Sequence, residues 1–275
     1  MPAQRMMKDT DIEDGRRKYQ KSLKLEVHLA DHCNLNCKGC DHFSPISEMS
    51  FLDVEQYEKD IKRIGMIAGD YLEHLFLLGG EPLLNREIVR ILEISRRYLS
   101  CPIYIVTNGI LLPEMPPLFW ETCRQHNVIL SITEYPLSID YKTIQKTGEL
   151  YGVSVQIFKD PAGKKQLYHL PIDLTGSQDY VENYLRCWRP KYPILKDGRI
   201  YPCVIPANIH HFNRYYGKEL SVVESDSVDI YSVSDIEELL YKLSIPIKFC
   251  RYCNIYGETS GHPFEVSKKQ IEEWL

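Results

Sequence analysis

Three cysteines lie close together in one short stretch of the chain: Cys33, Cys37 and Cys40 are separated by three and then by two residues. They follow an extended apolar run from Leu23 to Leu29. A loop of this length can place three thiolates around one corner of an iron–sulfur cluster, which is usually held by four cysteines. One iron would then lack a protein ligand and be open to a small molecule. We call these three residues the loop cysteines.

A zinc ion is the alternative to an iron–sulfur cluster at the loop cysteines. Structural zinc sites take four ligands, often from paired cysteines two to four residues apart. His32 or His42 could supply the fourth ligand. The spacing of the loop cysteines alone therefore leaves zinc and an iron–sulfur cluster both open.

A second set, the C-terminal cysteines, consists of Cys187, Cys203, Cys250 and Cys253. The chain has nine cysteines and no apolar signal segment near its N-terminus, which indicates a reducing compartment and favours metal binding or catalysis over disulfides. The remaining two, Cys101 and Cys123, are expected to be buried structural thiols.

The composition is that of an ordinary globular protein. Of its 275 residues 44% are hydrophobic and 26% charged, and the net charge is −5. A negative chain gives no electrostatic reason to bind nucleic acid or an anionic membrane. No apolar run approaches the ~20 residues that span a bilayer. These features predict a cytoplasmic protein with no nucleic-acid or membrane partner.

Short β-rich runs alternate with helical patterns between residues 23 and 159. This alternation predicts a parallel sheet in an α/β fold, and five convincing strands predict a partial barrel instead of a closed one. Residues 217–234 are expected to form a surface excursion. The predicted strands are Leu23–Leu29, His74–Leu78, Pro102–Val106, Asn127–Thr133 and Val153–Lys159; helices are predicted at 54–68, 88–99, 118–126, 138–151 and 234–243, and a β-hairpin at 192–204 with its turn at Lys196-Asp197-Gly198.

Several polar or glycine-rich motifs follow the predicted strands. They are the cysteine loop, Gly79-Gly80-Glu81-Pro82, Thr107-Asn108-Gly109 and the segment from Ser131 to Glu134. In parallel α/β folds the functional face is where the strands end. Four such motifs at one edge of one sheet predict a shared site there.

The Cys33-x3-Cys37-x2-Cys40 run, followed after the next strand by Gly79-Gly80-Glu81-Pro82, resembles the radical S-adenosylmethionine (SAM) superfamily. The resemblance covers residues 22–160 and the later cysteines. It implies that the loop cysteines hold a [4Fe–4S] cluster whose fourth iron binds SAM. Reduction would cleave SAM to a 5′-deoxyadenosyl radical that abstracts a hydrogen atom from the substrate, with a flavodoxin or ferredoxin as reductant.

The same resemblance implies a set of cofactor contacts. Gly79, Gly80 and Glu81 would receive the methionine amino group, next to Pro82. Where the family often has an aromatic residue just before the third cysteine, this chain has Gly39, so another residue must contact the adenine. The expected cofactor-binding residues are Gly79, Gly80, Glu81, Pro82, Asn108, Ser131, His42 and Phe43, with backbone at 156–158 as a further adenine contact.

The C-terminal cysteines are similar to the twitch form of the SPASM-type extension, in which four cysteines hold one auxiliary [4Fe–4S] cluster. The alternative is a zinc site built from one C-x2-C knuckle and two separate cysteines. Four thiolates would saturate a cluster, which favours electron transfer over substrate binding. The expected organisation is a polar lead-in at 1–22, a radical SAM core at 23–160, and a linker with a twitch domain at 161–275.

The arrangement looks like that of aminocyclitol dehydrogenases, which oxidise a ring alcohol. It predicts a small polyhydroxylated substrate such as a sugar, a nucleotide sugar or an aminocyclitol. A sugar dehydratase or epimerase, a SPASM-type peptide maturase that crosslinks or epimerises peptides, and a zinc-stapled binding module are the alternatives. The expected catalytic residues are Glu134, Tyr201, His210 and Arg189, with Lys159, Asp160, His211 and Asn213 as further polar residues near the substrate.

Overall fold

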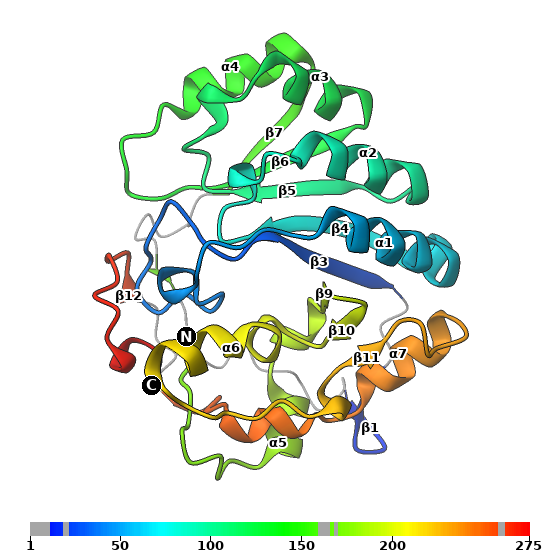
Figure 1. Ribbon diagram of the computed structural model, residues 1–275, viewed down its shortest axis with the longest axis vertical. Coiled ribbons are helices and arrows are strands. Elements are labelled where there is room, and N and C mark those ends of the chain that lie inside the picture. Colours follow the sequence, from blue (N-terminus) through cyan, green and yellow to red (C-terminus); the bar gives the residue numbers. More distant parts are fainter. Residues whose placement is uncertain (1–11, 19–21, 159–165, 168–169, 258–261) are drawn as a thin grey trace.

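The structure, a computed structural model, describes residues 12–18, 22–158, 166–167, 170–257 and 262–275. Its main feature is an open eight-stranded sheet with the strand order β11-β10-β9-β3-β4-β5-β6-β7. The sheet does not close, since β11 and β7 remain at its two edges. This confirms the predicted α/β fold and partial barrel (Figure 1).

Five parallel strands form the N-terminal part of this sheet. Each matches a predicted strand to within two residues at either end, because apolar runs bounded by polar turns specify strands locally. The strands are β3 (Leu23–Ala30), β4 (Leu72–Gly79), β5 (Ile103–Thr107), β6 (Val128–Thr133) and β7 (Ser154–Phe158).

Four helices connect these strands. Asp53 caps the first, α1, by accepting a hydrogen bond from the backbone N–H of Gln56. Their apolar stripes pack with the strands in one large core, which includes Leu25, Ile61 and Ile91. The helices are α1 (Val54–Ala68), α2 (Ile88–Tyr98), α3 (Pro117–Gln125) and α4 (Tyr141–Tyr151).

The predicted hairpin forms, but it also extends the core sheet. Strand β9 (Ile194–Lys196) pairs in parallel with β3, while β10 (Arg199–Tyr201) returns antiparallel to β9. Asp197 and Gly198 adopt φ values of 49° and 74°, as a tight two-residue hairpin turn requires. The proposed domain boundary near residue 160 lies outside the described residues.

The C-terminal half contains helices that the sequence did not predict, α5 (Tyr180–Arg186) and α6 (Val204–Tyr216), besides the expected α7 (Ile236–Ser244). The expectation of a surface excursion at 217–234 is wrong in part. That segment buries Leu220 and Ile230, and it adds β11 (Val228–Asp229) to the sheet. In Figure 1, α6 lies alongside β9 and β10, below β3.

Short elements complete the fold. Residues of the expected polar lead-in form a hairpin of β1 (Ile12–Glu13) and β2 (Arg16–Arg17), and β8 (Gln166–Leu167) pairs with β12 (His262–Pro263). Within the described residues, no helix combines the length and apolarity needed to cross a bilayer.

Candidate functional site

The loop cysteines follow the C-terminal end of β3, as predicted. Burial raises the pKa of the Cys33 and Cys37 thiols to about 12, and it also raises the pKa of Cys40. Glu81 and the two other thiols raise the pKa of Cys33 further. Such thiols stay protonated at neutral pH, whereas a coordinated metal supplies the positive charge that makes a bound thiol lose its proton.

The C-terminal tail fastens this loop. The Lys38 backbone N–H donates to the Glu265 carbonyl at 2.9 Å, and the side chains of Lys38 and Glu265 form an ion pair. The Trp274 indole N–H donates to the Cys40 carbonyl at 2.9 Å. In Figure 1, the red C-terminal segment accordingly lies beside the blue loop after β3. The sequence carries no signal for these contacts, because they join residues more than 200 positions apart.

Two glycines let the end of β4 approach the cysteine loop. The Gly80 N–H donates to the Ala30 carbonyl at 2.7 Å, and the Glu81 N–H donates to the His32 carbonyl at 3.1 Å. A Cβ on Gly80 would lie 2.0 Å from the His32 carbonyl oxygen, and one on Gly79 would lie 2.4 Å from that of Ala30. Only glycine permits this contact between the turn and the loop.

Glu81 has a different environment from the one expected of an amino-group ligand. Its side chain is fully buried, and its carboxylate accepts hydrogen bonds from the Thr107 hydroxyl at 2.6 Å, the Asn108 N–H at 3.0 Å and the Leu83 N–H at 3.2 Å. Burial raises the pKa of Glu81, while these donors favour its charged form. In this geometry Glu81 clamps the end of β5 to the turn after β4.

Asn108 reaches the cysteine loop directly. Its side-chain amide donates to the Asn34 Oδ1 at 2.7 Å, and its own Oδ1 accepts from the Ile110 N–H at 3.0 Å. Ser131 is buried on the neighbouring strand β6, and Pro82 begins the 3₁₀ turn Pro82–Leu84. The motifs after β4 and β5 therefore meet at the cysteine loop, as the sequence predicted.

The two residues expected near the adenine, Phe43 and His42, have different surroundings. Phe43 is 1% exposed and packs against Phe212 and Trp274 in the C-terminal core, so it does not line an open site. The His42 ring stacks on His28, with ring centres 4.7 Å apart. Burial lowers the pKa of His42 well below its usual range.

The four expected catalytic residues do not form one group. Tyr201 ends β10, whereas Glu134 follows β6, and four strands lie between these two in the sheet. Partial desolvation and then the charge of Lys196 lower the pKa of His210 on α6 to about 4, so this imidazole is neutral at physiological pH. Arg189 pairs with Asp41. Lys159 and Asp160 fall outside the described residues.

Arg189 lies between the two cysteine sets. Its partner Asp41 directly follows Cys40, and its charge opposes the effect of burial on the pKa of Cys187. Its guanidinium also lies over the Trp188 ring at 4.9 Å. The side chain therefore connects the two regions and is not free to act as an acid or base.

The C-terminal cysteines converge on one buried cavity. All four line it, together with Asn183, Tyr184 and Arg189. Burial raises the pKa of each of these thiols, to about 12 for Cys203. Asn183 donates to the carbonyls of Cys250 and Cys253, and Arg17 from the N-terminal hairpin donates to the Cys187 carbonyl.

Two side chains near the site were missed in the sequence. Tyr135 interacts with the Cys37 thiol, and burial raises its pKa well above the usual range. Glu26 lies in register with Phe76 of β4, which in turn is level with Tyr104 of β5. Tyr135 follows the end of β6, and Glu26 alternates with apolar residues along β3, so both could have been suspected from their positions.

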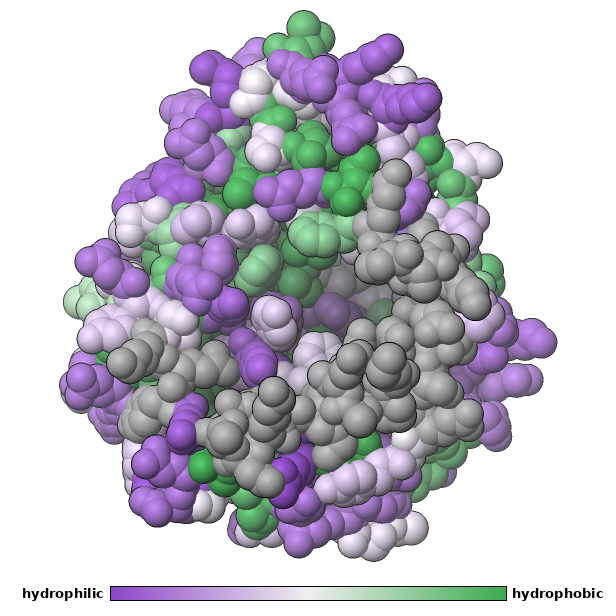
Figure 2. All heavy atoms as spheres, turned by 180° about the vertical axis from the view of Figure 1, so that it is seen from behind, coloured by the Kyte–Doolittle hydropathy of each residue, from purple (hydrophilic) through white to green (hydrophobic). Residues whose placement is uncertain are grey.

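Glu26 is half-buried, so part of the residue remains exposed to solvent. Burial raises its pKa to about 8, opposed by the charge of Arg189. Within the described residues its carboxylate has no hydrogen-bond or ion-pair partner. Aromatic rings of His74, Phe76, Tyr104 and Tyr192 contact one another beside it. Seen from behind, the molecule has a central hollow bordered by both polar and apolar residues (Figure 2).

Comparisons with known proteins agree with this architecture. The chain is 27% identical over 258 residues to a GTP 3′,8-cyclase of Clostridium acetobutylicum, a match that covers 86% of this chain and 78% of the relative. A GTP 3′,8-cyclase of Synechocystis is 36% identical over 108 residues, which cover 38% of this chain and 31% of the relative.

Two solved structures share the fold. BtrN in complex with AdoMet and 2-DOIA superposes with a TM-score of 0.53 at 16% identity, covering 85% of this chain and 93% of BtrN. AdoMet-bound anSMEcpe gives 0.51 at 14% identity, covering 84% and 82%. Residues 27–136, which contain the cysteine loop and the turn after β4, match the model of the radical SAM superfamily. This part of the chain is therefore similar to the radical SAM superfamily.

Proposed function

We propose that the protein is a radical SAM enzyme that oxidises an alcohol of a small polyhydroxylated molecule. The observation that carries the proposal is the meeting of three motifs at one sheet edge: the loop cysteines, the Gly79-Gly80-Glu81 turn and Asn108. When bound, a [4Fe–4S] cluster and SAM supply a 5′-deoxyadenosyl radical that removes a hydrogen atom from substrate.

The loop cysteines fit such a cluster. They are half-buried, neighbour one another and lie on a loop held in place by the C-terminal tail, so the protein fixes their positions. The backbone around Gly79 and Gly80 would face the amino acid part of SAM. Asn108 would contact the same cofactor beside Asn34, and Ser131 is a further contact on β6.

The C-terminal cysteines are proposed to hold a second [4Fe–4S] cluster in a twitch-type extension spanning residues 161–275. Four thiolates around one zinc ion would stand about 3.8 Å apart, given zinc–sulfur bonds of about 2.3 Å. In the described part of the chain, only Asp31, His210 and His211 gather three ligand atoms within 4.8 Å of one another. No three of the C-terminal thiols meet this limit, although all four line one cavity, and we favour a cluster over zinc because the core matches the model of the radical SAM superfamily.

Glu26 is the residue that we assign as proton acceptor, in place of Glu134, Tyr201 and His210. An alcohol that loses a hydrogen atom must also lose a proton and an electron to become a ketone. Burial raises the pKa of Glu26 to about 8, so its ionised form is a stronger base than an exposed carboxylate. Only this ionised form can accept the proton, so the rate of oxidation should rise as the pH approaches 8. A second cluster held by the C-terminal cysteines would supply the electron acceptor, and the pair of Arg189 and Asp41 connects that region to the cysteine loop. A flavodoxin or ferredoxin would reduce the first cluster.

Cyclisation of GTP is a second candidate function, favoured by the relatives. The Clostridium acetobutylicum protein named GTP 3′,8-cyclase aligns over 86% of this chain. Both candidates begin with hydrogen abstraction, so SAM cleavage alone does not distinguish them. They differ in product: oxidation removes two hydrogens from the substrate, whereas cyclisation joins two atoms within the nucleotide.

The first test counts iron and acid-labile sulfide in anaerobically purified protein, wild type against the Cys33/Cys37/Cys40→Ala triple variant. Loss of about half the iron in the variant supports two [4Fe–4S] clusters. Loss of nearly all iron argues against a second cluster, and zinc without iron in both proteins refutes the radical reaction.

The second test identifies the product. Reduced protein is incubated with SAM and with an aminocyclitol, a nucleotide sugar or GTP in turn. A ketone formed together with 5′-deoxyadenosine supports oxidation, and the triple variant serves as the control. A cyclised nucleotide formed from GTP would replace the alcohol-oxidation proposal by the second candidate.

A further inference from the structure

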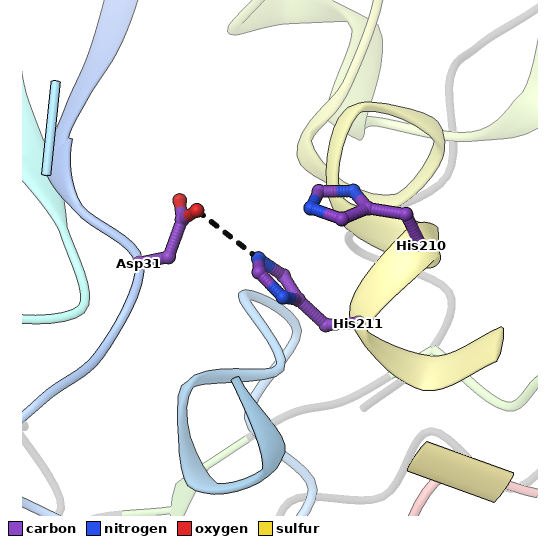
Figure 3. A group of neighbouring side chains, drawn as sticks. All are labelled: Asp31, His210 and His211. Carbon is purple, nitrogen blue, oxygen red and sulfur yellow. Dashed lines mark ion pairs between the residues drawn. The ribbon is translucent and has the colours of Figure 1, made fainter. Parts of the chain in front are cut away.

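A cluster of two imidazoles and one carboxylate lies beside the cysteine loop, and neither candidate reaction uses it. Asp31 follows β3 directly, and His210 and His211 project from α6 (Figure 3). One ligand atom from each of the three lies within 4.8 Å of the other two. Two elements far apart in the sequence thus bring three metal-binding groups together.

His211 is buried without the hydrogen bonds that an imidazole needs. Its side chain is 4% exposed, and neither ring nitrogen has a hydrogen-bond partner within the described part of the chain. Its Nε2 lies 3.2 Å from the Asp31 Oδ2, but the two are not aligned as a hydrogen bond. Burying an imidazole without hydrogen bonds costs free energy, so we expect a further group to bind the His211 ring.

The 3.2 Å separation also suits two ligands of one metal ion. Bonds of about 2.0–2.1 Å in a tetrahedral site place neighbouring ligand atoms about 3.4 Å apart. Asp31 and His211 therefore already stand at nearly the required spacing. His210 is exposed on α6, so its ring can rotate toward the same point.

The other oxygen of Asp31 is held separately. The Lys196 ammonium lies 3.8 Å from Asp31 Oδ1, and the Asn208 Oδ1 accepts a hydrogen bond from this ammonium at 2.9 Å. His28 approaches the same Oδ1 at 3.9 Å. These contacts orient the carboxylate so that Oδ2 faces His211. The positive charge of Lys196 opposes a cation at the site and limits its affinity.

We propose that Asp31, His210 and His211 bind one divalent metal ion of the class that prefers imidazole nitrogen with carboxylate oxygen, such as Zn²⁺ or Fe²⁺. Three protein ligands leave at least one coordination position open. Because Asp31 is two residues before Cys33, a water or a substrate hydroxyl at this position would lie next to the cysteine loop. The ion is separate from the proposed clusters.

The test of this site measures the binding of Zn²⁺, with no other metal added. Anaerobic protein with its iron content verified receives one equivalent of Zn²⁺, is desalted, and is analysed for zinc and by X-ray absorption at the zinc edge. We expect about one zinc per chain with nitrogen and oxygen ligands at about 2.0–2.1 Å. His211→Ala should abolish binding, and His210→Ala should weaken it at least about tenfold, since even loss of an outer partner costs that much.

The control is His126→Ala, which changes a histidine at the end of α3 and should bind zinc like the wild type. Lys196→Gln should bind more tightly because it removes the opposing charge. His210 is exposed, so its variant also tests the site should His211→Ala fail to fold. The proposal is overturned if the wild type retains no zinc, if its zinc has sulfur ligands at about 2.3 Å, or if His210→Ala binds zinc undiminished.

Discussion

Replacing Glu81 by glutamine separates two roles for this residue. As an amino-group ligand of SAM it would affect cofactor affinity and leave the fold unchanged. As the clamp described above it supports the ends of β4 and β5 by accepting from Thr107, Asn108 and Leu83. Glutamine has the same shape but only one acceptor oxygen, so the variant tests the hydrogen bonds without changing the volume.

The size of the effect follows from the three donors. If the amide oxygen of Glu81→Gln keeps the contacts with Thr107 and Leu83, its NH₂ faces the Asn108 N–H, and two donors meet in a fully buried site. Each unsatisfied buried donor costs about 1–3 kcal/mol. We therefore expect a loss of about 2–4 kcal/mol, which corresponds to a fall in the melting temperature of about 5 to 15 °C.

The assay compares the apparent melting temperature and the equilibrium affinity for SAM under anaerobic conditions at one scan rate. Thr107→Val is the companion variant, since it removes one donor of the same clamp and should cost about 1 kcal/mol. The two variants together should cost less than their sum, because they break the same contact. An unchanged melting temperature with weakened SAM binding would refute the clamp and restore the amino-group role.

Three further predictions concern neighbouring contacts. Gly80→Ala sets a methyl carbon 2.0 Å from the His32 carbonyl oxygen, so we expect a loss of about 1–3 kcal/mol and a lower iron content per chain. Trp274→Phe removes the donor to the Cys40 carbonyl; it should cost about 1 kcal/mol and speed iron loss to a chelator. Glu26 retains its proton in the folded state up to about pH 8 but releases it near 4.5 when unfolded. Stability should therefore fall as pH rises through this window, by at most about 5 kcal/mol, and Glu26→Gln should make melting temperature less pH-dependent.

Each of these three predictions has a matched control variant or an outcome that would contradict it. Gly217→Ala adds a methyl group with nothing within 4 Å and should keep its full iron content. Trp120→Phe alters the main core away from both cysteine sets and should not change the rate of iron loss. An equal rate for Trp274→Phe would show that the tail does not fasten the loop, and an unaltered pH profile in Glu26→Gln would contradict the raised pKa.

Local sequence patterns predicted most of the first half of the fold. Strands β3 to β7 and the helices between them follow from apolar periodicity and from caps such as Asp53, because these signals act within a few residues. The hairpin turn at Asp197 and Gly198 was likewise encoded by two residues that tolerate positive φ. Helix α6 was missed, because most of its residues are buried and it therefore lacks a clear polar face.

The roles of the side chains were harder to predict from the sequence than the places of the residues in the fold. Glu81 and Phe43 stand where the motifs placed them, but both side chains point into packed interiors. The direction of a side chain depends on what packs against its element, which the spacing of a motif does not contain. Glu26 was overlooked for the same reason, since its environment is made by β4, β9 and the segment around Arg189.

The sequence by itself determined the α/β alternation, the loop cysteines after the first core strand, and the glycine turn after the second. All three are encoded in contiguous residues. Only the tertiary structure brought Trp274 onto the cysteine loop, gathered the C-terminal cysteines around one cavity, and set His211 against Asp31. Those contacts join segments tens to hundreds of residues apart, and the free energy that selects them comes from burying whole faces of helices and strands together.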